Sequence, residues 1–267
     1  MTNPNLFNQL LIWPIINLLV AFYKGLSTIG IPGAFGWAII LLTVAIRFIL
    51  YPLTKAQLSS AKKMADLKPH LDHLSKKHKD DKKRLQQEQL RLYKEAGVNP
   101  AAGCLPLLLQ FPVLIALYRV FFTLLSTGNI GDLVKDINSI VYFPFLHIEH
   151  FDLTFFGVNL IIKPNQWQQY GWWLLLIPVI TGVLQFIQAK FTPSMAPKPS
   201  PKKDEKSNQD DMQQAMQMQM QYFMPLLIGY FALSFPVGLS LYWNTFTIFA
   251  IIQQVLINKS HVQIVKS

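Results

Sequence analysis

The sequence predicts an all-α integral membrane protein, and three of its properties support this fold class. Hydrophobic residues make up 51% of the 267 residues and charged residues only 14%, which is too apolar a balance for an ordinary soluble domain. Several apolar stretches are long enough to cross a bilayer, and the positive charges behind a net charge of +10 gather in one loop. We expect five transmembrane helices, with the N-terminus outside and the C-terminus inside, that enclose a hydrophilic groove.

Residues 1–34 are expected to form an amphipathic segment that lies in the external membrane–water interface. The stretch is apolar, but Asn8, Pro14 and Asn17 interrupt it and Lys24 ends it. These interruptions favour an interfacial helix, with a sixth span as the alternative. No basic segment precedes the stretch, so it does not have the form of a signal peptide. An external N-terminus without a signal fits a longer natural precursor or a trimmed start.

The first three spans follow from length. A helix rises about 1.5 Å per residue and the hydrocarbon core is about 30 Å thick, so a span needs roughly 20 apolar residues. Residues 35–54 form the first expected span, residues 99–126 the second and residues 171–190 the third. Asn99 and Pro100 are typical of a helix start, with Asn as the cap and Pro at the first helical position.

The last apolar stretch, residues 222–258, is too long for one crossing. As a single helix it would measure about 55 Å, well beyond the thickness of the hydrocarbon core. A Pro-Val-Gly sequence at 236–238 interrupts it. We therefore expect a fourth span at residues 222–235 and a fifth at residues 237–258.

The basic residues orient these spans, because short loops rich in Lys and Arg stay in the cytoplasm. Residues 55–98 hold twelve basic residues against six acidic ones, whereas residues 127–170 hold two against four. The first of these loops is therefore expected in the cytoplasm and the second outside. The linker at residues 191–221 and the tail at residues 259–267 carry further lysines, and both are expected in the cytoplasm.

The cytoplasmic loop at residues 55–98 is expected to be a helical hairpin. Four apolar residues recur in it at intervals of three, four and three, which is a helical pattern: Met64, Leu67, Leu71 and Leu74. A second helix is expected to begin at Asp80 or Asp81 as its N-cap and to end at Gly97.

Arg47 lies within the first expected span, where a charge is costly. The cost at a helix centre is about 2.5 to 3.5 kcal/mol on insertion scales. The side chain can snorkel to the cytoplasmic headgroups, or it can face an internal polar cavity. Thr43 lies one turn earlier on the same face, and none of the five expected spans contains an Asp or Glu. We favour the cavity, where water, lipid or a ligand supplies the counter-charge.

Polar residues in the other spans are candidates for lining the same cavity. They are Gln110 in the second span, Thr181, Gln185 and Gln188 in the third, and Asn244, Gln253 and Gln254 in the fifth. Each glutamine can equally serve as a hydrogen-bonding contact between helices. The candidate groove consists of Arg47, Thr43, Gln110, Gln185, Gln188 and Asn244.

The residue types in the spans argue against several kinds of chemistry. The single cysteine, Cys104, excludes an internal disulfide, and all six histidines lie outside the apolar stretches. We expect no metal site and no cofactor.

An intramembrane hydrolase would need a nucleophile with a base or a metal, and no expected span contains His, Asp or Glu. A small-solute transporter is the second hypothesis, but it would usually show internal repeats and intramembrane acids.

Several short motifs follow one another along nearly the whole chain. They are Thr43-Val44-Ala45-Ile46-Arg47, Tyr51-Pro52-Leu53-Thr54-Lys55, Val98-Asn99-Pro100, Gly103-Cys104-Leu105-Pro106, Gln110-Phe111-Pro112, Ala116-Leu117-Tyr118, Phe235-Pro236-Val237-Gly238-Leu239-Ser240-Leu241-Tyr242-Trp243 and Ile252-Gln253-Gln254. In this combination and order they resemble the YidC/Oxa/Alb family of membrane protein insertases. The sequence departs from many Gram-negative members, which have a large periplasmic domain and an extra N-terminal span, and from many Gram-positive members, which have a lipobox cysteine.

The resemblance implies a five-span core whose groove opens to the cytoplasm and the lipid, with Arg47 as the groove arginine. It implies a multi-pass protein of the bacterial plasma (inner) membrane that works without bond-making chemistry. The expected partners are nascent membrane proteins, the Sec translocon, the ribosome and the lipid bilayer, with no dedicated nucleic-acid site. The hairpin residues expected to contact clients or the ribosome are Lys62, Lys63, Lys76, Lys77, Lys82, Lys83 and Arg84.

Overall fold

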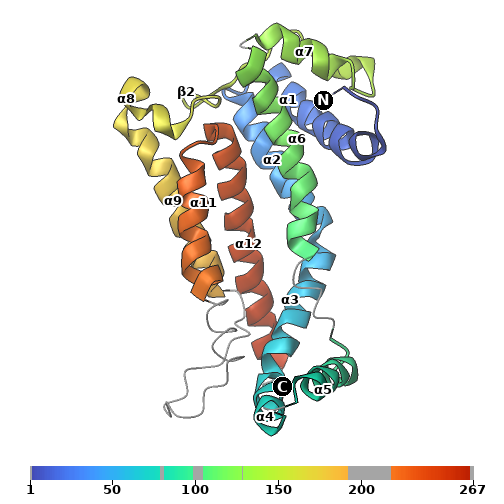
Figure 1. Ribbon diagram of the computed structural model, residues 1–267. Helices are drawn as coiled ribbons and strands as arrows, with labels where there is room; N and C mark the ends of the chain where they lie inside the picture. The colour runs from blue at the N-terminus through green and yellow to red at the C-terminus, as the bar shows by residue number, and fades with distance from the viewer. Residues whose placement is uncertain (1, 79–80, 99–104, 128, 192–217, 265–267) are drawn as a thin grey trace.

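The computed structural model describes residues 2–78, 81–98, 105–127, 129–191 and 218–264. Within these ranges, side chains are described except at residues 68, 72, 76, 82, 105–110, 124–127, 220 and 258–264. The described chain is mostly helical. Figure 1 shows long helices side by side, with a small helical hairpin at one end and a cap of shorter elements at the other.

The described residues from Asn8 to Thr127 form seven helical segments. Their bounds are η1 Asn8–Ile12, α1 Trp13–Thr28, α2 Ala34–Ile49, α3 Tyr51–Asp66, α4 Lys68–Lys77, α5 Lys82–Glu95 and α6 Leu105–Thr127. The cap follows, with α7 Ile130–Asn138, η3 Pro144–Leu146, strands β1 Thr154–Phe155 and β2 Val158–Asn159, η4 Pro164–Gln166, α8 Trp167–Tyr170 and η5 Trp172–Leu175. The other helices of the described chain are α9 Leu176–Phe191, η7 Gln219–Phe223, α11 Met224–Ala232 and α12 Val237–Ile264.

Three helices in the described chain are long and apolar enough to cross a membrane: Asn8–Thr28, Trp172–Phe191 and Val237–Ile257. The number of candidate spans rises to four if α2 and α3, which bend by 61° at their junction, count as one span. The prediction of a mostly helical membrane protein is therefore confirmed. The count of five spans and their orientation stay predictions, as do the boundaries of the segments.

The bend between α2 and α3 falls inside the first expected span, residues 35–54. Pro52 is the second residue of α3, and a proline ring clashes with the carbonyl of the residue four positions earlier and removes a helical hydrogen bond. The junction residue Leu50 still donates its backbone N–H to the carbonyl of Ile46. The chain therefore turns from α2 toward the hairpin without a loop.

The ends of the second hairpin helix are where the capping residues in the sequence predict them. The carboxylate of Asp81 accepts a hydrogen bond from the backbone N–H of Arg84 at 3.0 Å and so caps α5. Gly97 follows α5 with a φ of +64°, a conformation that glycine adopts without strain. Met64 and Leu85 are buried, so the apolar stripe of the hairpin faces inward.

The main core lies at the end of the molecule opposite the hairpin, where α1, α2, α6 and α7 meet (Figure 1). Phe35 and Phe121 are fully buried, with ring centroids 5.9 Å apart, and the ring of Phe151 lies 4.7 Å from that of Phe35. The cap loops close this core from outside. They contain a two-stranded hairpin, β1 paired antiparallel with β2, so the predicted all-α class omits a small element of sheet.

The polar residues that interrupt the N-terminal stretch hold the cap in place. Asn17 donates to the carbonyl of Ile140 at 3.0 Å and accepts from the backbone N–H of Tyr142 at 2.7 Å. The Tyr23 hydroxyl donates to the carbonyl of His150 and accepts from the backbone N–H of Asp152. Asn17 and Tyr23 are both buried, so their side chains satisfy backbone groups that would otherwise lose hydrogen bonds on burial.

The helices α9, α11 and α12 form the other part of the bundle (Figure 1). Glycines bring α9 and α11 close together, because a Cβ atom on Gly229 would lie 3.4 Å from the Cα of Gly182. The break between α11 and α12 is tied to the cap, where the backbone N–H groups of Val237 and Gly238 donate to the carbonyls of Ile162 and Leu160, both at 2.9 Å. Helix α12 then runs between α9 and α2 and contacts both.

Candidate functional site

Arg47 lies in the last turn of α2, with only 7% of its surface exposed. Its Nη1 donates to Oε1 of Gln253 at 3.2 Å, and its Nη2 donates to the backbone carbonyl of Phe246 at 2.9 Å. The guanidinium carbon also lies 3.5 Å from the centre of the Phe246 ring. All these contacts come from α12, so the arginine faces the interior of the bundle and not the lipid.

The described partners of Arg47 are neutral. Gln253 returns a weak contact from its Nε2 to the backbone carbonyl of Arg47 at 3.4 Å, so the two residues face each other across the α2–α12 interface. The Nε of Arg47 is buried and has no hydrogen-bond partner among the described residues. A carbonyl, an amide and an aromatic face solvate a guanidinium but do not neutralise it. None of these described partners therefore cancels the positive charge of Arg47.

Thr43 lies one turn before Arg47 and is almost fully buried. Its hydroxyl donates to the carbonyl of Ile39 in its own helix at 2.7 Å, which is common for threonine within helices. The two predicted residues thus face the same interior, but the hydroxyl of Thr43 is engaged with its own backbone.

Of the third-span candidates, Gln185 contacts α12, at a position next to Phe246 along the chain. Gln185 donates to the hydroxyl of Thr247 at 3.2 Å, and Thr247 donates in turn to the carbonyl of Trp243. Gln188 is partly buried on the next turn. Gln185 therefore makes a hydrogen bond between helices, which is the alternative to lining a cavity.

Asn244 is partly buried on α12, and its Oδ1 is buried without a partner among the described residues. Gln110 lies on α6, but its side chain is outside the described residues. No described hydrogen bond joins Asn244, Gln185 or Thr43 to Arg47. The structure therefore places the candidates on α2, α6, α9 and α12, with α12 between α2 and α9. The groove that they would line stays a prediction.

Gln253 and Phe246 are the Arg47 contacts absent from the candidate groove. Gln253 is visible in the sequence as a polar residue within an apolar stretch. Which of the adjacent glutamines, Gln253 or Gln254, meets Arg47 depends on the side that α12 turns toward α2. Phe246 contributes a backbone carbonyl and a ring, and neither has a signal in a pattern of polar residues.

The basic residues of the hairpin are on its surface where they are described. Lys63, Lys77, Lys83 and Arg84 are exposed and Lys62 is partly buried, whereas the side chains of Lys76 and Lys82 are outside the described residues. The exposed side chains give the hairpin a positive surface that can meet an anionic partner.

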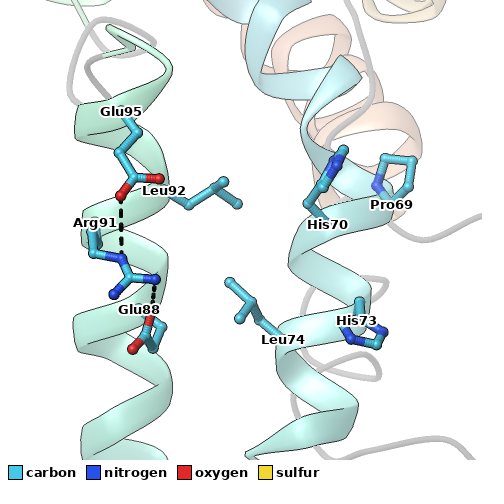
Figure 2. A pocket seen from close by; sticks show the side chains of 8 residues that line it. All are labelled: Pro69, His70, His73, Leu74, Glu88, Arg91, Leu92 and Glu95. Atoms are coloured by element: carbon cyan, nitrogen blue, oxygen red, sulfur yellow. Dashed lines mark ion pairs between the residues drawn. The ribbon is translucent and has the colours of Figure 1, made fainter.

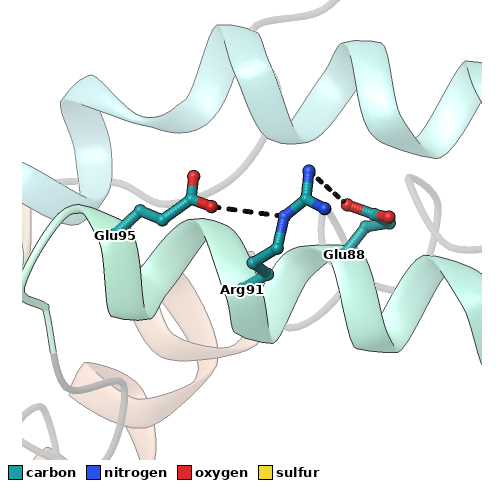
Figure 3. Close-up of polar contacts among 3 residues, drawn as sticks. All are labelled: Glu88, Arg91 and Glu95. Atoms are coloured by element: carbon teal, nitrogen blue, oxygen red, sulfur yellow. Dashed lines mark ion pairs between the residues drawn. The ribbon is translucent and has the colours of Figure 1, made fainter.

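A pocket of about 300 Å³ lies between α4 and α5 (Figure 2). Its lining residues are Pro69, His70, His73, Leu74, Glu88, Arg91, Leu92 and Glu95. Leu74 and Leu92 point toward each other across the gap. Arg91 forms ion pairs with Glu88 at 3.0 Å and with Glu95 at 3.3 Å along one face of α5 (Figure 3). Such exposed pairs contribute little stability.

No cluster of three or more His, Cys, Asp or Glu residues suited to a metal ion occurs in the described part of the chain. Its buried polar groups are amides, hydroxyls and one guanidinium. These groups can solvate a peptide or attract a carboxylate through hydrogen bonds and charge.

Comparison with known proteins identifies the family. The model of the 60Kd inner membrane protein family matches residues 27–264. A protein of Wolinella succinogenes named "Membrane protein insertase YidC" is 32% identical over 228 residues, covering 85% of this chain and 34% of that protein. Proteins of the same name from Rickettsia conorii and Rickettsia typhi are 33% and 32% identical over 253 residues, each alignment covering 92% of this chain and 39% of the relative.

The chain thus spans little more than a third of the length of these relatives. The match nevertheless includes the helices that carry Arg47, Gln185 and Gln253. Together with helices long enough to cross a bilayer, it shows that the chain belongs to the 60Kd inner membrane protein family of the bacterial inner membrane.

Proposed function

We propose that this chain is a membrane protein insertase, which helps short hydrophilic tails of nascent membrane proteins to cross the bilayer and releases their hydrophobic segments into lipid. Membership of the family and relatives named as insertases support this activity. The observation that carries it is Arg47, a buried cation on an apolar helix whose described partners are all neutral.

The proposed mechanism is assisted partitioning without any bond-making step. Most of the barrier to moving a polar tail through the bilayer is the desolvation of its charges. Water in a groove beside α2, α9 and α12 would shorten the dry path, and the charge of Arg47 would attract acidic groups on the tail. The apolar segment of the client would then leave along α9 and α12, driven by burial in lipid.

The proposed topology has five spans, an external N-terminus and a cytoplasmic C-terminus. The contacts of η1 and α1 support an interfacial N-terminal helix. Asn8, at its start, accepts a hydrogen bond from Arg119 in the second half of α6 at 2.6 Å, and Tyr23, near its end, bonds the cap. Both ends of the helix therefore contact the part of the molecule opposite the hairpin (Figure 1), which is the arrangement expected for a helix that lies along one membrane surface.

The proposed partners are nascent membrane proteins, the ribosome and the Sec translocon, with the insertase working alone or beside the translocon. The exposed basic residues Lys63, Lys77, Lys83 and Arg84 of the hairpin support contact with a ribosome or a client. The same charges suit anionic lipid headgroups. The hairpin lies at the end of the bundle where such partners would arrive if the proposed orientation holds.

The experiment that tests this function is insertion of a single-span client with an acidic tail into liposomes that contain the purified protein. Arg47→Ala is expected to reduce insertion of this client, because no charge remains to attract the tail, whereas Arg47→Lys retains much of the activity. A client with a neutral tail serves as the control and is expected to lose less. Equal insertion of the acidic client by wild type and Arg47→Ala would contradict the proposed role of the charge.

A further inference from the structure

The turn between β1 and β2 holds a phenylalanine in an unfavourable backbone conformation. The strands pair Thr154 with Asn159 and Phe155 with Val158, so the turn consists of Phe156 and Gly157. Both turn residues have positive φ, +48° and +80°, as in the hairpin turns that favour Asn-Gly. A bulky residue at positive φ is a genuine outlier. Packing of the ring does not explain this choice, because Phe156 is 80% exposed.

The turn is fixed on the cap end of α2. The ring of Phe155 occupies the space beside Gly36, where a Cβ atom would collide with it. The Trp37 ring lies 5.6 Å from that of Phe155 and 6.2 Å from that of Phe156, which completes a cluster of three aromatic rings. The Phe156 ring therefore lies outside the core but beside a helix, and its position relative to α2 is set by the hairpin.

The same face of α2 continues as an exposed apolar surface. Leu41 follows Trp37 by one turn and Phe48 follows two turns later, and these spacings place the three residues on one side of the helix. All three are among the exposed large hydrophobic residues, Phe48 at 66%. In a helix of a membrane protein such a face meets lipid. The aromatic cluster stands where this face ends.

We propose that Trp37, Phe155 and Phe156 form an aromatic anchor that lies in the boundary between the acyl chains and the headgroups, on the membrane side opposite the hairpin. The partner is the lipid bilayer itself. Tryptophan concentrates at this boundary because its ring combines an apolar body with a polar N–H, and phenylalanine rings insert on its acyl side. In this proposal, the unfavourable turn holds the Phe156 ring outside the core, where it can enter the membrane.

The anchor sets the depth of the site. Arg47 follows Trp37 by ten positions, which corresponds to about 15 Å along the helix axis. The hydrocarbon core is about 30 Å thick, so a boundary at Trp37 places the Arg47 backbone near the middle of the membrane. The inference requires that α2 enters the membrane at its cap end, as the proposed topology has it, but it does not depend on the insertase activity.

The test measures depth with spin labels in the full-length chain. Cys104, the single cysteine, is replaced by alanine, and a cysteine with a nitroxide label is placed singly at Phe156, Leu41, Phe48 or the exposed cap residue Asn165. The proteins are reconstituted in vesicles of phosphatidylethanolamine and phosphatidylglycerol. Collisions with oxygen, which partitions into lipid, are compared with collisions with a water-soluble nickel chelate.

We expect the label at Phe156 to favour oxygen over the nickel chelate, and this preference to rise several-fold from Phe156 through Leu41 to Phe48. The label at Asn165 is expected to favour the chelate. If the label at Phe156 is as accessible to nickel as the label at Asn165, the anchor lies in water and the proposal is wrong. Low collision rates with both reagents at Phe156 would also overturn it, because a second copy of the chain would then cover the cluster.

Discussion

Arg47 combines a buried charge with neutral partners, and this combination explains how it can be both stable and useful. The carbonyl of Phe246, the ring of Phe246 and the amide of Gln253 offset part of the cost of burying the guanidinium. A carboxylate in the place of Gln253 would offset more of that cost but would cancel the charge. The neutral amide therefore joins α2 to α12 without cancelling the charge that, in the proposed mechanism, attracts an external anion.

Gln253→Glu is the substitution that separates these two roles. A glutamate at this position would form an ion pair with Arg47 in a low-dielectric interior, where such pairs are strong. We expect insertion of a client with an acidic tail to fall toward the level of Arg47→Ala, while a client with a neutral tail is less affected. Parallel insertion assays with the two clients measure the difference.

Two further variants control for this prediction. Gln253→Met removes the amide without adding a charge, and it should preserve more of the preference for acidic tails than Gln253→Glu. Gln254→Glu adds a carboxylate on the neighbouring residue, about 100° further round α12 than the amide that accepts from Arg47. If both glutamate variants behave alike toward the two clients, the pairing with Arg47 is not the cause.

At the scale of helices, the glycines of α9 and α11 set the distance between two neighbours. Gly182 and Gly229 face each other so closely that a Cβ on Gly229 would also lie 3.3 Å from the carbonyl oxygen of Pro178. Small residues permit this close approach in membrane helices, where packing and not water drives association. The position of α9 relative to α12, and with it the Gln185–Thr247 contact, depends on this interface.

Gly229→Leu is expected to destabilise the protein by about 1 to 3 kcal/mol, the usual cost of overpacking a tight contact. The measurement is thermal unfolding of the purified protein in detergent, where the variant should unfold at a lower temperature than wild type. Gly25→Leu is the matched control, because a Cβ atom there meets nothing within 4 Å. Equal unfolding temperatures for Gly229→Leu and wild type would show that α9 and α11 are not closely packed.

The sequence predicted those features that are determined by residues next to one another along the chain. The cap at Asp81, the glycine at position 97 and the break before Val237 all arise from the chemistry of a few adjacent residues. By contrast, the ring of Phe155 fills the space beside Gly36, and no local signal in the sequence reports such a contact between distant parts of the chain. The partner of Arg47 likewise lies 206 positions away, and periodicity within one helix carries no information on which face of another helix it meets.

At the scale of the whole molecule, the N-terminal helix distinguishes two topologies. An interfacial helix has both ends on the external side, whereas a sixth span places its ends on opposite sides. Single cysteines at Gln9 and Thr28, both exposed, are introduced in the Cys104→Ala background. A membrane-impermeant thiol reagent added to intact spheroplasts should label both positions, since the proposed topology leaves both outside.

One position in the cap and one in the hairpin calibrate this measurement. A cysteine at Glu149 in the cap should be labelled in intact spheroplasts, and one at Lys83 in the hairpin only after lysis. Labelling of just one of positions 9 and 28 before lysis would show that the helix crosses the membrane, and the proposed five-span arrangement would then be wrong.

The central claim is that clients pass along the polar side of α9 and α12 near Arg47. The most direct measurement is photo-crosslinking from single positions of the membrane-embedded protein to a ribosome-stalled membrane protein of increasing length. Crosslinkers at Gln185 and Asn244 should capture the nascent chain, whereas one at Leu226, which is 74% exposed on α11, should capture mainly lipid. Crosslinks from Leu226 at every length, with none from Gln185 or Asn244, would contradict the claim.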